Sequence, residues 1–334
     1  MGLQRQQRAG AQLTSHMTYP ESVVVGLIQG VTELFPVSSL GHNVLIPALI
    51  GGSWAQDLSV SAPESPYLAF IVGMHVATAA AIILYFWRDW VRLVGGFLSS
   101  LRERRIATAD QRLAWMIILA TIPVGIAGLV LEHAFRVVFS KPLPTALFLA
   151  LNGVILLGGE RMMRRRSLPL AAPASESVQP DGQRVESHAG SARDLEVAQA
   201  VAADRRLSGM SFGKAVLIGT AQIAALLPGI SRDGIVSVTG MARGFSRGDA
   251  VRYSFLLSAP VILAAGVLKI PDLTGPLGNG IGGQVLVGSL LSFVGAYLSV
   301  RFLTRYFAKE RSLTPFGIYC LLAGLGSFVY LLVR

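Results

Sequence analysis

The apolar residues of this chain fall into long blocks that show neither the alternation of a strand nor the single apolar face of a soluble helix. Six blocks are apolar on all faces and approach the roughly 20 residues that a helix needs to cross a bilayer. They run over residues 67–87, 113–131, 144–159, 251–268, 285–303 and 316–333. The pattern predicts six transmembrane helices and therefore an all-α polytopic membrane protein.

Two further apolar stretches are interrupted by proline. The first runs from residue 22 to 50 and is broken at Pro36, and the second runs from 212 to 240 and is broken at Pro228. Each half of each stretch is too short to span the bilayer, and polar residues lie at both breaks. Backbone that leaves a helix at membrane depth must be buried in protein or line a wet cavity. We therefore expect two re-entrant helix–loop–helix hairpins whose breaks meet inside the bundle.

The two hairpins divide the chain into halves with a similar pattern. LFPVSS (34–39) and LLPGIS (226–231) share leucine, proline and serine positions, and related apolar strings follow both at a similar spacing. Three spans per half give the halves opposite orientations, which predicts an inverted-topology repeat; the alternative is a chance likeness between apolar strings. The expected organisation is a polar tail (1–19), a first half (20–160, hairpin 20–50), a polar cytoplasmic loop (161–211) and a second half (212–334, hairpin 212–243).

The charge pattern orients these spans. Charged residues make up 14% of the chain, little more than half of the roughly 25% typical of soluble domains. The net charge of +10 comes from basic residues beside apolar blocks, in 88–112, 161–166 and 301–311. The positive-inside rule explains this excess without a nucleic-acid partner, and it places these segments in the cytoplasm and the C-terminus outside. Arg5 and Arg8 leave the side of the N-terminus open.

The remaining composition excludes several classes of site. The single Cys320 rules out an intramolecular disulfide and any metal site built from several cysteines. No cleavable signal peptide is recognised in the first 19 residues. The polar insertion 167–210 is rich in Ala, Ser and Pro before it turns into a possible short amphipathic helix over 194–206. Its simplest interpretation is a dispensable linker without chemistry.

Candidate chemistry in the first hairpin lies in QGVTELFPVSSLGH. Gln29 and Glu33 are four residues apart and share one helix face. Ser38 and Ser39 follow the break, where serine is a favoured helix N-cap. With His42 at the start of the next helix, an acid, two hydroxyls and an imidazole gather on one turn.

The second hairpin carries PGISRDG. Gly229 and Gly234 free the backbone near a helix N-terminus, whose N–H groups and dipole suit a phosphate. Arg232 adds a planar guanidinium that matches phosphate oxygens. Ser231 lies directly before this arginine.

Each of these residues also has a purely structural interpretation. An intramembrane glutamate can be neutral and hydrogen-bonded, an arginine can reach the interface, and a serine after proline can be only a cap. The functional interpretation is favoured because ionisable groups in a bilayer are costly and usually functional. Gln29, His75 and Asp233 stay unassigned by this reasoning.

The two motifs resemble a known family. QGVTELFPVSSLGH is similar to the first signature of the bacitracin-resistance family of undecaprenyl-pyrophosphate phosphatases, and PGISRDG resembles its second, P-G-x-S-R-S-G. The resemblance runs from about Pro20 to the C-terminus, apart from 167–210. It implies a bacterial plasma-membrane enzyme that removes one phosphate from a polyprenyl pyrophosphate lipid, recycles the cell-wall lipid carrier and confers bacitracin resistance. It also implies a homodimer whose site opens to the outer face.

The resemblance assigns roles to residues of this chain. It implies catalytic roles for Glu33, Ser39, His42 and Arg232, with Ser39 as the candidate nucleophile, and substrate-binding roles for Ser38, Gly229, Ser231 and Gly234. It also implies a divalent cation, Mg²⁺ or Ca²⁺, with Gln29 and Glu33 as its candidate ligands. Whether Ser39 attacks or orients an attacking water stays open, with Glu33 as base or metal ligand.

Three positions depart from the family pattern. Gln29 stands where glutamate is frequent, Leu40 where a small hydroxyl residue is usual, and Asp233 where the second signature has serine. Asp233 can either pair with Arg232 or repel the substrate phosphates. An alternative function is a polyprenyl-phosphate flippase, since inverted repeats with broken helices are a transporter design. A purely structural membrane protein would leave ionisable groups at membrane depth unexplained.

Overall fold

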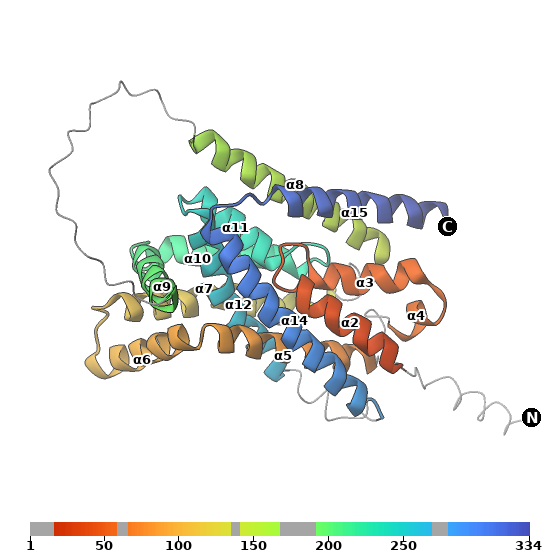
Figure 1. Cartoon of the computed structure of the whole chain (residues 1–334), viewed down its shortest axis with the longest axis horizontal. Coiled ribbons are helices and arrows are strands. Elements are labelled where there is room, and N and C mark those ends of the chain that lie inside the picture. The colour runs from red at the N-terminus through yellow and green to blue at the C-terminus, as the bar shows by residue number, and fades with distance from the viewer. Residues whose placement is uncertain (1–16, 59–65, 135–140, 168–191, 269–279) are drawn as a thin grey trace, which may run out of the picture.

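The computed structural model describes residues 17–58, 66–134, 141–167, 192–268 and 280–334. Within these ranges the chain forms helices and no strands (Figure 1). The helices are α2 (Tyr19–Thr32), α3 (Ser39–Ile50), α4 (Gly52–Asp57), α5 (Pro66–Tyr85), α6 (Trp87–Glu103), α7 (Ala109–Ala134), α8 (Pro142–Ser167), α9 (Ala192–Ser208), α10 (Phe212–Thr220), the 3-10 helix η2 (Ala221–Leu226), α11 (Arg232–Ala242), α12 (Arg247–Leu268), α14 (Gly282–Ala308) and α15 (Thr314–Val333). The predicted all-α class is confirmed.

The predicted spans coincide with helices. Within the described residues, α7, α8, α12, α14 and α15 are each long and apolar enough to cross a membrane. The sixth predicted span is α5, which meets α6 at an angle of 86°. The protein is therefore a multi-pass membrane protein.

Helix α6 was not expected from the sequence, because its arginines led us to interpret the segment as a basic cytoplasmic loop. The same segment also has an apolar pattern of helical spacing. Exposed apolar side chains recur every three or four residues along one face, at Trp87, Val91, Val94, Leu98 and Leu101. This spacing makes an amphipathic helix, the kind that lies along a membrane surface. The basic segment 88–112 thus begins as a helix and not as a loop.

Both hairpins are present as helix–loop–helix units. The first consists of α2 and α3, joined by residues 33–38, and the second of α10 with η2, followed by α11. Serine caps the returning helix in both: Ser38 Oγ accepts from Gly41 N, and Ser231 Oγ accepts from Gly234 N. Such caps satisfy N–H groups that a helix start leaves without partners.

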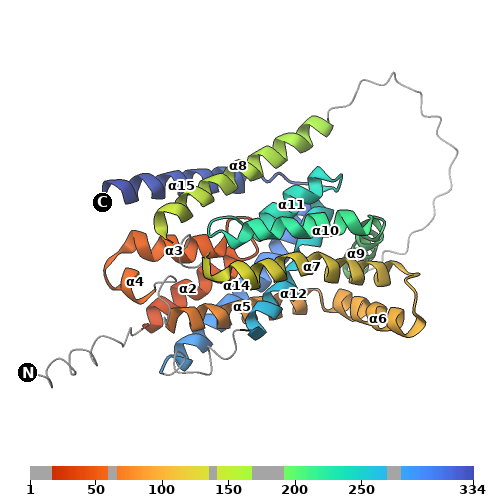
Figure 2. The same ribbon diagram turned by 180° about the vertical axis from the view of Figure 1, so that it is seen from behind.

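Each hairpin packs on the opposite half of the chain. Helix α2 lies against α14, and α10 lies against α7 in the corresponding position (Figures 1 and 2). The pairs α5–α12 and α8–α15 also join equivalent spans of the two halves. This exchange of neighbours is the packing that an interdigitated inverted repeat requires. It brings the two hairpin breaks to the same place.

Small residues allow these close helix crossings. A Cβ at Gly26 of α2 would lie only 2.6 Å from the carbonyl oxygen of Gly288 in α14, and a Cβ at Gly219 of α10 would collide with Ala120 of α7. Glycine lets backbones approach in this way, which is a common basis of helix association in membranes.

The polar insertion is only partly a linker. Residues 192–208 form α9, which extends the helix predicted over 194–206 and packs on α7 and α12. Its Asp204 is 2% exposed and accepts hydrogen bonds from Arg92 (2.6 Å) and Arg252 (2.9 Å). The linker interpretation is therefore wrong for α9. Residues 168–191 of the insertion and 1–16 of the predicted tail lie outside the described residues.

We expect deletion of residues 170–189 to leave expression and thermal stability unchanged, because a polar segment rich in Ala, Ser and Pro has little apolar surface to contribute to a core. Asp204→Ala should instead destabilise the protein. Breaking a buried ion pair costs about 3–5 kcal/mol. We expect a loss of at most about 3 kcal/mol here, because Asp89 still pairs with both Arg92 and Arg252. Thermal unfolding in detergent measures both changes. Glu103→Ala is the control, because its pair with Arg105 is exposed.

Candidate active site

The two hairpin breaks touch. Gly229 N donates a hydrogen bond of 3.2 Å to Ser38 Oγ, which also accepts from Gly41 N at 3.2 Å. The backbone of Gly41 also lies against Gly229, because a Cβ added at Gly41 would be 3.0 Å from the Cα of Gly229. The predicted meeting of the breaks inside the bundle is therefore confirmed.

Glycine at position 229 is required by conformation and by space. Its φ of +112° lies in a region that L side chains rarely adopt. A Cβ would also lie 2.6 Å from Thr145 O and from Leu149 N of α8. The turn at Pro228–Gly229 therefore packs directly on the backbone of α8.

Asn152 of α8 joins the two breaks. Its Nδ2 donates to the carbonyl oxygen of Pro36 (3.0 Å), and its Oδ1 accepts from Ser231 N (3.0 Å). The side chain is fully buried, so it replaces water as the partner of one backbone group from each hairpin. Sequence reasoning missed it, although an asparagine inside an apolar span was an available signal.

We expect Asn152→Leu, which keeps the volume, to destabilise the protein by about 2–6 kcal/mol, since two buried backbone groups each lose a partner worth about 1–3 kcal/mol. Thermal unfolding in detergent is the measurement. Leu151→Ala serves as the control, because its side chain lies on the exposed face of the same helix. Equal stability of Asn152→Leu and the parent protein would show that the two hairpins do not depend on this bridge.

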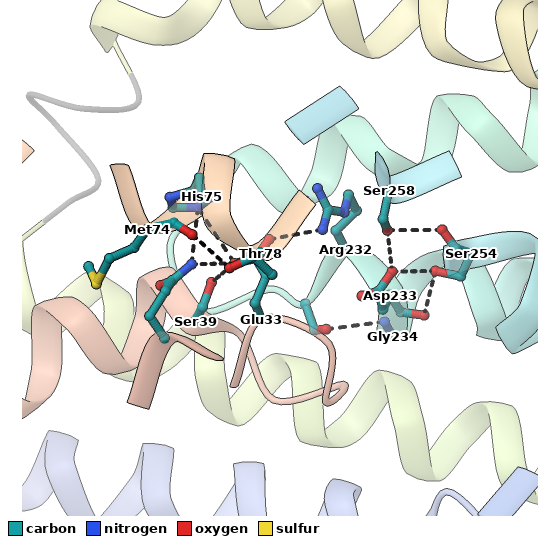
Figure 3. A network of polar contacts seen from close by, with 12 residues as sticks. Glu33, Ser39, Met74, His75, Thr78, Arg232, Asp233, Gly234, Ser254 and Ser258 are labelled. Atoms are coloured by element: carbon teal, nitrogen blue, oxygen red, sulfur yellow. Dashed lines mark hydrogen bonds and ion pairs between the residues drawn. The ribbon is translucent and has the colours of Figure 1, made fainter. Parts of the chain in front are cut away.

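Glu33 is the centre of the polar network (Figure 3). Its Oε1 accepts from Arg232 Nη2 at 2.9 Å, across the two hairpins. Its Oε2 accepts from Ser39 Oγ, in a very short contact, and from Gln29 Nε2 at 2.9 Å. The side chains of Glu33 and Arg232 are 6% and 15% exposed. The structure thus brings together the acid, one serine and the arginine that the motifs indicated.

Further polar side chains extend this network from neighbouring helices. Asn43 of α3 donates to Gln29 Oε1 at 2.7 Å. His75 of α5 has its Nε2 at 3.5 Å from Glu33 Oε2. Asn43 was not singled out from the sequence, and His75 was left unassigned, because nothing local connects either residue with the hairpin motif.

His42 is engaged away from Glu33. Its Nδ1 lies 2.7 Å from the carbonyl oxygen of Ser38, and because a carbonyl only accepts, Nδ1 is the donor. Its Nε2 then accepts from the hydroxyl of Tyr319 in α15 at 2.7 Å, and the two rings stack. His42 therefore holds the turn at Ser38, and its partner Tyr319 could not be identified from the sequence.

Asp233 faces α12. Its Oδ1 accepts from Ser254 Oγ and Ser258 Oγ, both at 2.6 Å (Figure 3). The sequence left pairing with Arg232 or repulsion of phosphate as its options, and the structure shows a third, attachment of α11 to α12. Within the described residues, Arg232 Nε is buried without a hydrogen-bond partner, as is Asp233 Oδ2.

Few side chains near Glu33 could coordinate a divalent cation. Within the described residues, no group of three or more His, Cys, Asp or Glu side chains is arranged to hold a metal ion. Glu33 supplies one carboxylate and Gln29 one amide. Mg²⁺ is commonly held by one or two carboxylates together with substrate phosphates and water. The Glu33 carboxylate therefore fits a cation that binds together with a phosphorylated substrate, whereas the Gln29 amide would have to turn first, because its nitrogen faces Glu33 and its oxygen accepts from Asn43.

Two broken hairpins that join a glutamate, a serine and an arginine inside a helical bundle define a polytopic membrane protein with a polar site suited to phosphate. A family model described as bacitracin resistance protein BacA matches residues 22–326, and the chain belongs to this family.

Relatives match over nearly their whole length. The chain is 61% identical over 322 residues to the undecaprenyl-diphosphatase of Mycolicibacterium paratuberculosis, covering 96% of this chain and 100% of that protein. It is 51% identical over 334 residues to undecaprenyl-diphosphatase 2 of Frankia alni, covering 92% and 96%. It is 39% identical over 317 residues to undecaprenyl-diphosphatase 2 of Chromobacterium violaceum, covering 94% and 99%.

Proposed function

We propose that this protein is an undecaprenyl-diphosphatase, which hydrolyses undecaprenyl pyrophosphate to the monophosphate and phosphate. The names of relatives at up to 61% identity support this activity. The observation that carries it is the contact of Glu33 with both Arg232 and Ser39. This contact places a carboxylate base, a hydroxyl and the guanidinium that would bind phosphate side by side. The reaction recycles the lipid carrier of cell-wall precursors and accounts for the family's association with bacitracin resistance.

Arg232 binds the diphosphate. Its Nη2 is held by Glu33, while its buried Nε has no partner among the described residues. A buried donor without a partner is unfavourable, and a phosphate oxygen would satisfy it. The start of α11, capped by Ser231, adds a positive helix end beside the same phosphate.

Glu33 activates the nucleophile. Because Ser39 Oγ donates to Glu33 Oε2, the proton leaves Ser39 toward Glu33 as the oxygen attacks the terminal phosphorus. The bond from that phosphorus to the bridging oxygen breaks, and undecaprenyl phosphate leaves with the proton that Glu33 received, so Glu33 is a carboxylate again. Glu33 then takes a proton from the water that attacks the phosphoserine, and the Ser39 oxygen leaves as phosphate is released. In the alternative, Ser39 orients a water that Glu33 deprotonates. His42 acts through the turn at Ser38 in either case.

A divalent cation, Mg²⁺ or Ca²⁺, would be held by Glu33 and Gln29 and would neutralise charge on the diphosphate. Arg232 and Glu33 together carry no net charge, so these two side chains alone do not neutralise the negative charge of the diphosphate. Transfer of a phosphoryl group depends on such neutralisation.

The protein acts in the bacterial plasma membrane, as a homodimer, with the site accessible from the outer face. The basic ends of α6, α8 and α14 support this orientation, since they belong on the cytoplasmic side. The prenyl tail stays among the apolar helices while the diphosphate enters between the hairpins.

Phosphate release from undecaprenyl pyrophosphate by the purified protein in detergent tests the function. We expect multiple turnovers by the parent protein and none by Arg232→Ala. A flippase, which the inverted repeat with broken helices also suits, releases no phosphate but moves the lipid across vesicles. Lipid movement without phosphate release would therefore replace the proposed function with transport.

A further inference from the structure

Ser38, the residue directly before α3 in the first hairpin, has an unfavourable backbone conformation. Its φ of +69° lies in a region where residues with a side chain are rarely found. Such a conformation persists only where surrounding contacts hold it, and it is common at functional sites. The hydroxyl of the next residue, Ser39, contacts Glu33. The backbone of Ser38 therefore sets the direction of the proposed nucleophile.

His42 holds the carbonyl group of Ser38 with two donors. Its backbone N–H donates at 3.2 Å, as expected for the first turn of α3, and its ring Nδ1–H donates at 2.7 Å. The backbone bond belongs to any helix start, whereas the ring bond exists only in one orientation of the imidazole. Whatever fixes this orientation therefore helps to hold the strained turn.

Tyr319 of α15 fixes the imidazole from its other end. The tyrosine hydroxyl donates to Nε2 of His42 at 2.7 Å, and the planes of the two rings differ by only 4°. The His42 side chain is buried, and a buried nitrogen without a partner is unfavourable. With both nitrogens bound, the ring cannot turn without breaking a hydrogen bond.

We propose that Tyr319 is a positioning residue for hydrolysis of the diphosphate. Tyr319 orients His42, and His42 holds the carbonyl group of Ser38. The turn at Ser38 then directs Ser39 toward Glu33. This inference rests on the proposed function, because it assigns a residue to that reaction. Since Tyr319 acts through His42 and does not bind the diphosphate, it affects the rate of phosphoryl transfer and not substrate binding.

Steady-state kinetics of purified Tyr319→Phe test this role. The Tyr319 side chain is 47% exposed on the surface of α15, so the variant loses the hydroxyl and keeps the packing of the ring. We expect kcat to fall about 10–100-fold, the range that one unsatisfied buried nitrogen accounts for, and KM to stay unchanged. Tyr330→Phe is the matched control, because Tyr330 lies on the same helix and is 49% exposed, and it should keep the parental kcat. Parental kcat in Tyr319→Phe, or a change in KM alone, would overturn the proposal.

A double variant shows whether Tyr319 acts through His42. His42→Asn places an amide N–H close to the position of Nδ1, so it can still donate to the carbonyl group of Ser38, but it offers no Nε2 to the tyrosine. In this background Tyr319→Phe should cause no further loss of kcat. Two losses that simply add would mean that the hydroxyl contributes by another route, against the proposed role.

NMR of the Nδ1–H proton of His42 gives a test that needs no turnover. In protein labelled with ¹⁵N at histidine, His42→Asn identifies this resonance, because it is the one that disappears. In Tyr319→Phe the hydrogen bond to Ser38 should weaken, so that the proton moves to higher field and exchanges with water about tenfold faster. An unchanged resonance would refute the positioning role even if kcat falls. A weakened hydrogen bond in a protein that releases no phosphate in any form would keep the contact chain but reject the phosphatase.

Discussion

Arg232→Lys should lower the rate of phosphate release by about 10²–10³-fold, a loss comparable with removal of one preorganised donor in an active site. The arginine holds Glu33 through Nη2 and keeps Nε for the substrate. A lysine keeps the positive charge, but its compact ammonium cannot supply donors at both positions. The measurement is steady-state turnover of protein purified at the parent's yield.

Arg243→Lys is the matched control for this variant. Arg243 follows the same helix, α11, at its other end, where it is exposed, so its replacement should leave turnover unchanged. Near-parental turnover of Arg232→Lys would show that Arg232 contributes only charge and that its planar geometry is irrelevant.

Ser39→Ala should abolish phosphate release, because the hydroxyl that contacts Glu33 is the proposed nucleophile. Glu33→Gln should lower turnover by about 10²–10⁴-fold, the usual contribution of a general base. Rapid quenching of a single turnover, followed by mass spectrometry of the protein, should detect phosphoserine at position 39 in the parent.

The stereochemistry at phosphorus gives an independent answer. A substrate with a chiral terminal phosphorus should react with retention if Ser39 attacks first and water second, and with inversion if water attacks directly. Slow turnover by Ser39→Ala, inversion and no phosphoserine would together assign the attack to water. In that case Glu33→Gln should be the more damaging change.

The hairpins and their central residues could be predicted from the sequence because their signals are local. A proline breaks an apolar stretch, and polar residues gather within a few positions of the break. Glu33, Ser39 and Arg232 were found in this way, and the structure confirms that they meet. The roles assigned to them stay predictions until the variants are measured.

The partners supplied by other helices could not be predicted from the sequence. Asn152, His75 and Tyr319 each lie alone in an apolar span, more than 40 residues from the motif residue that they contact. Only the crossing of helices reveals those contacts. Helix α6 was missed for another reason, since its arginines indicated orientation and hid the apolar face between them.

Asp233 shows how a motif departure can be accommodated. Its position beside Arg232 in sequence suggested an electrostatic role at the phosphate. The helix start turns consecutive side chains in different directions, so Asp233 points to Ser254 and Ser258 while Arg232 points to Glu33. The hydroxyls of Ser254 and Ser258 on α12 donate to the buried carboxylate of Asp233, which explains how an aspartate is tolerated where the second signature has serine.

The ion pair between Glu33 and Arg232 has a consequence for biosynthesis. The two residues are 199 positions apart, so at about 5–20 residues per second the ribosome needs about 10–40 s to reach the arginine after the glutamate. During this interval the acid of the first hairpin lacks its arginine and has His75 of the same half as its remaining ionisable neighbour, and a bare charge is excluded from hydrocarbon. We therefore expect the hairpin to stay at the wet edge of the membrane, or to carry a neutral or His75-paired acid, until the second half of the nascent chain supplies Arg232.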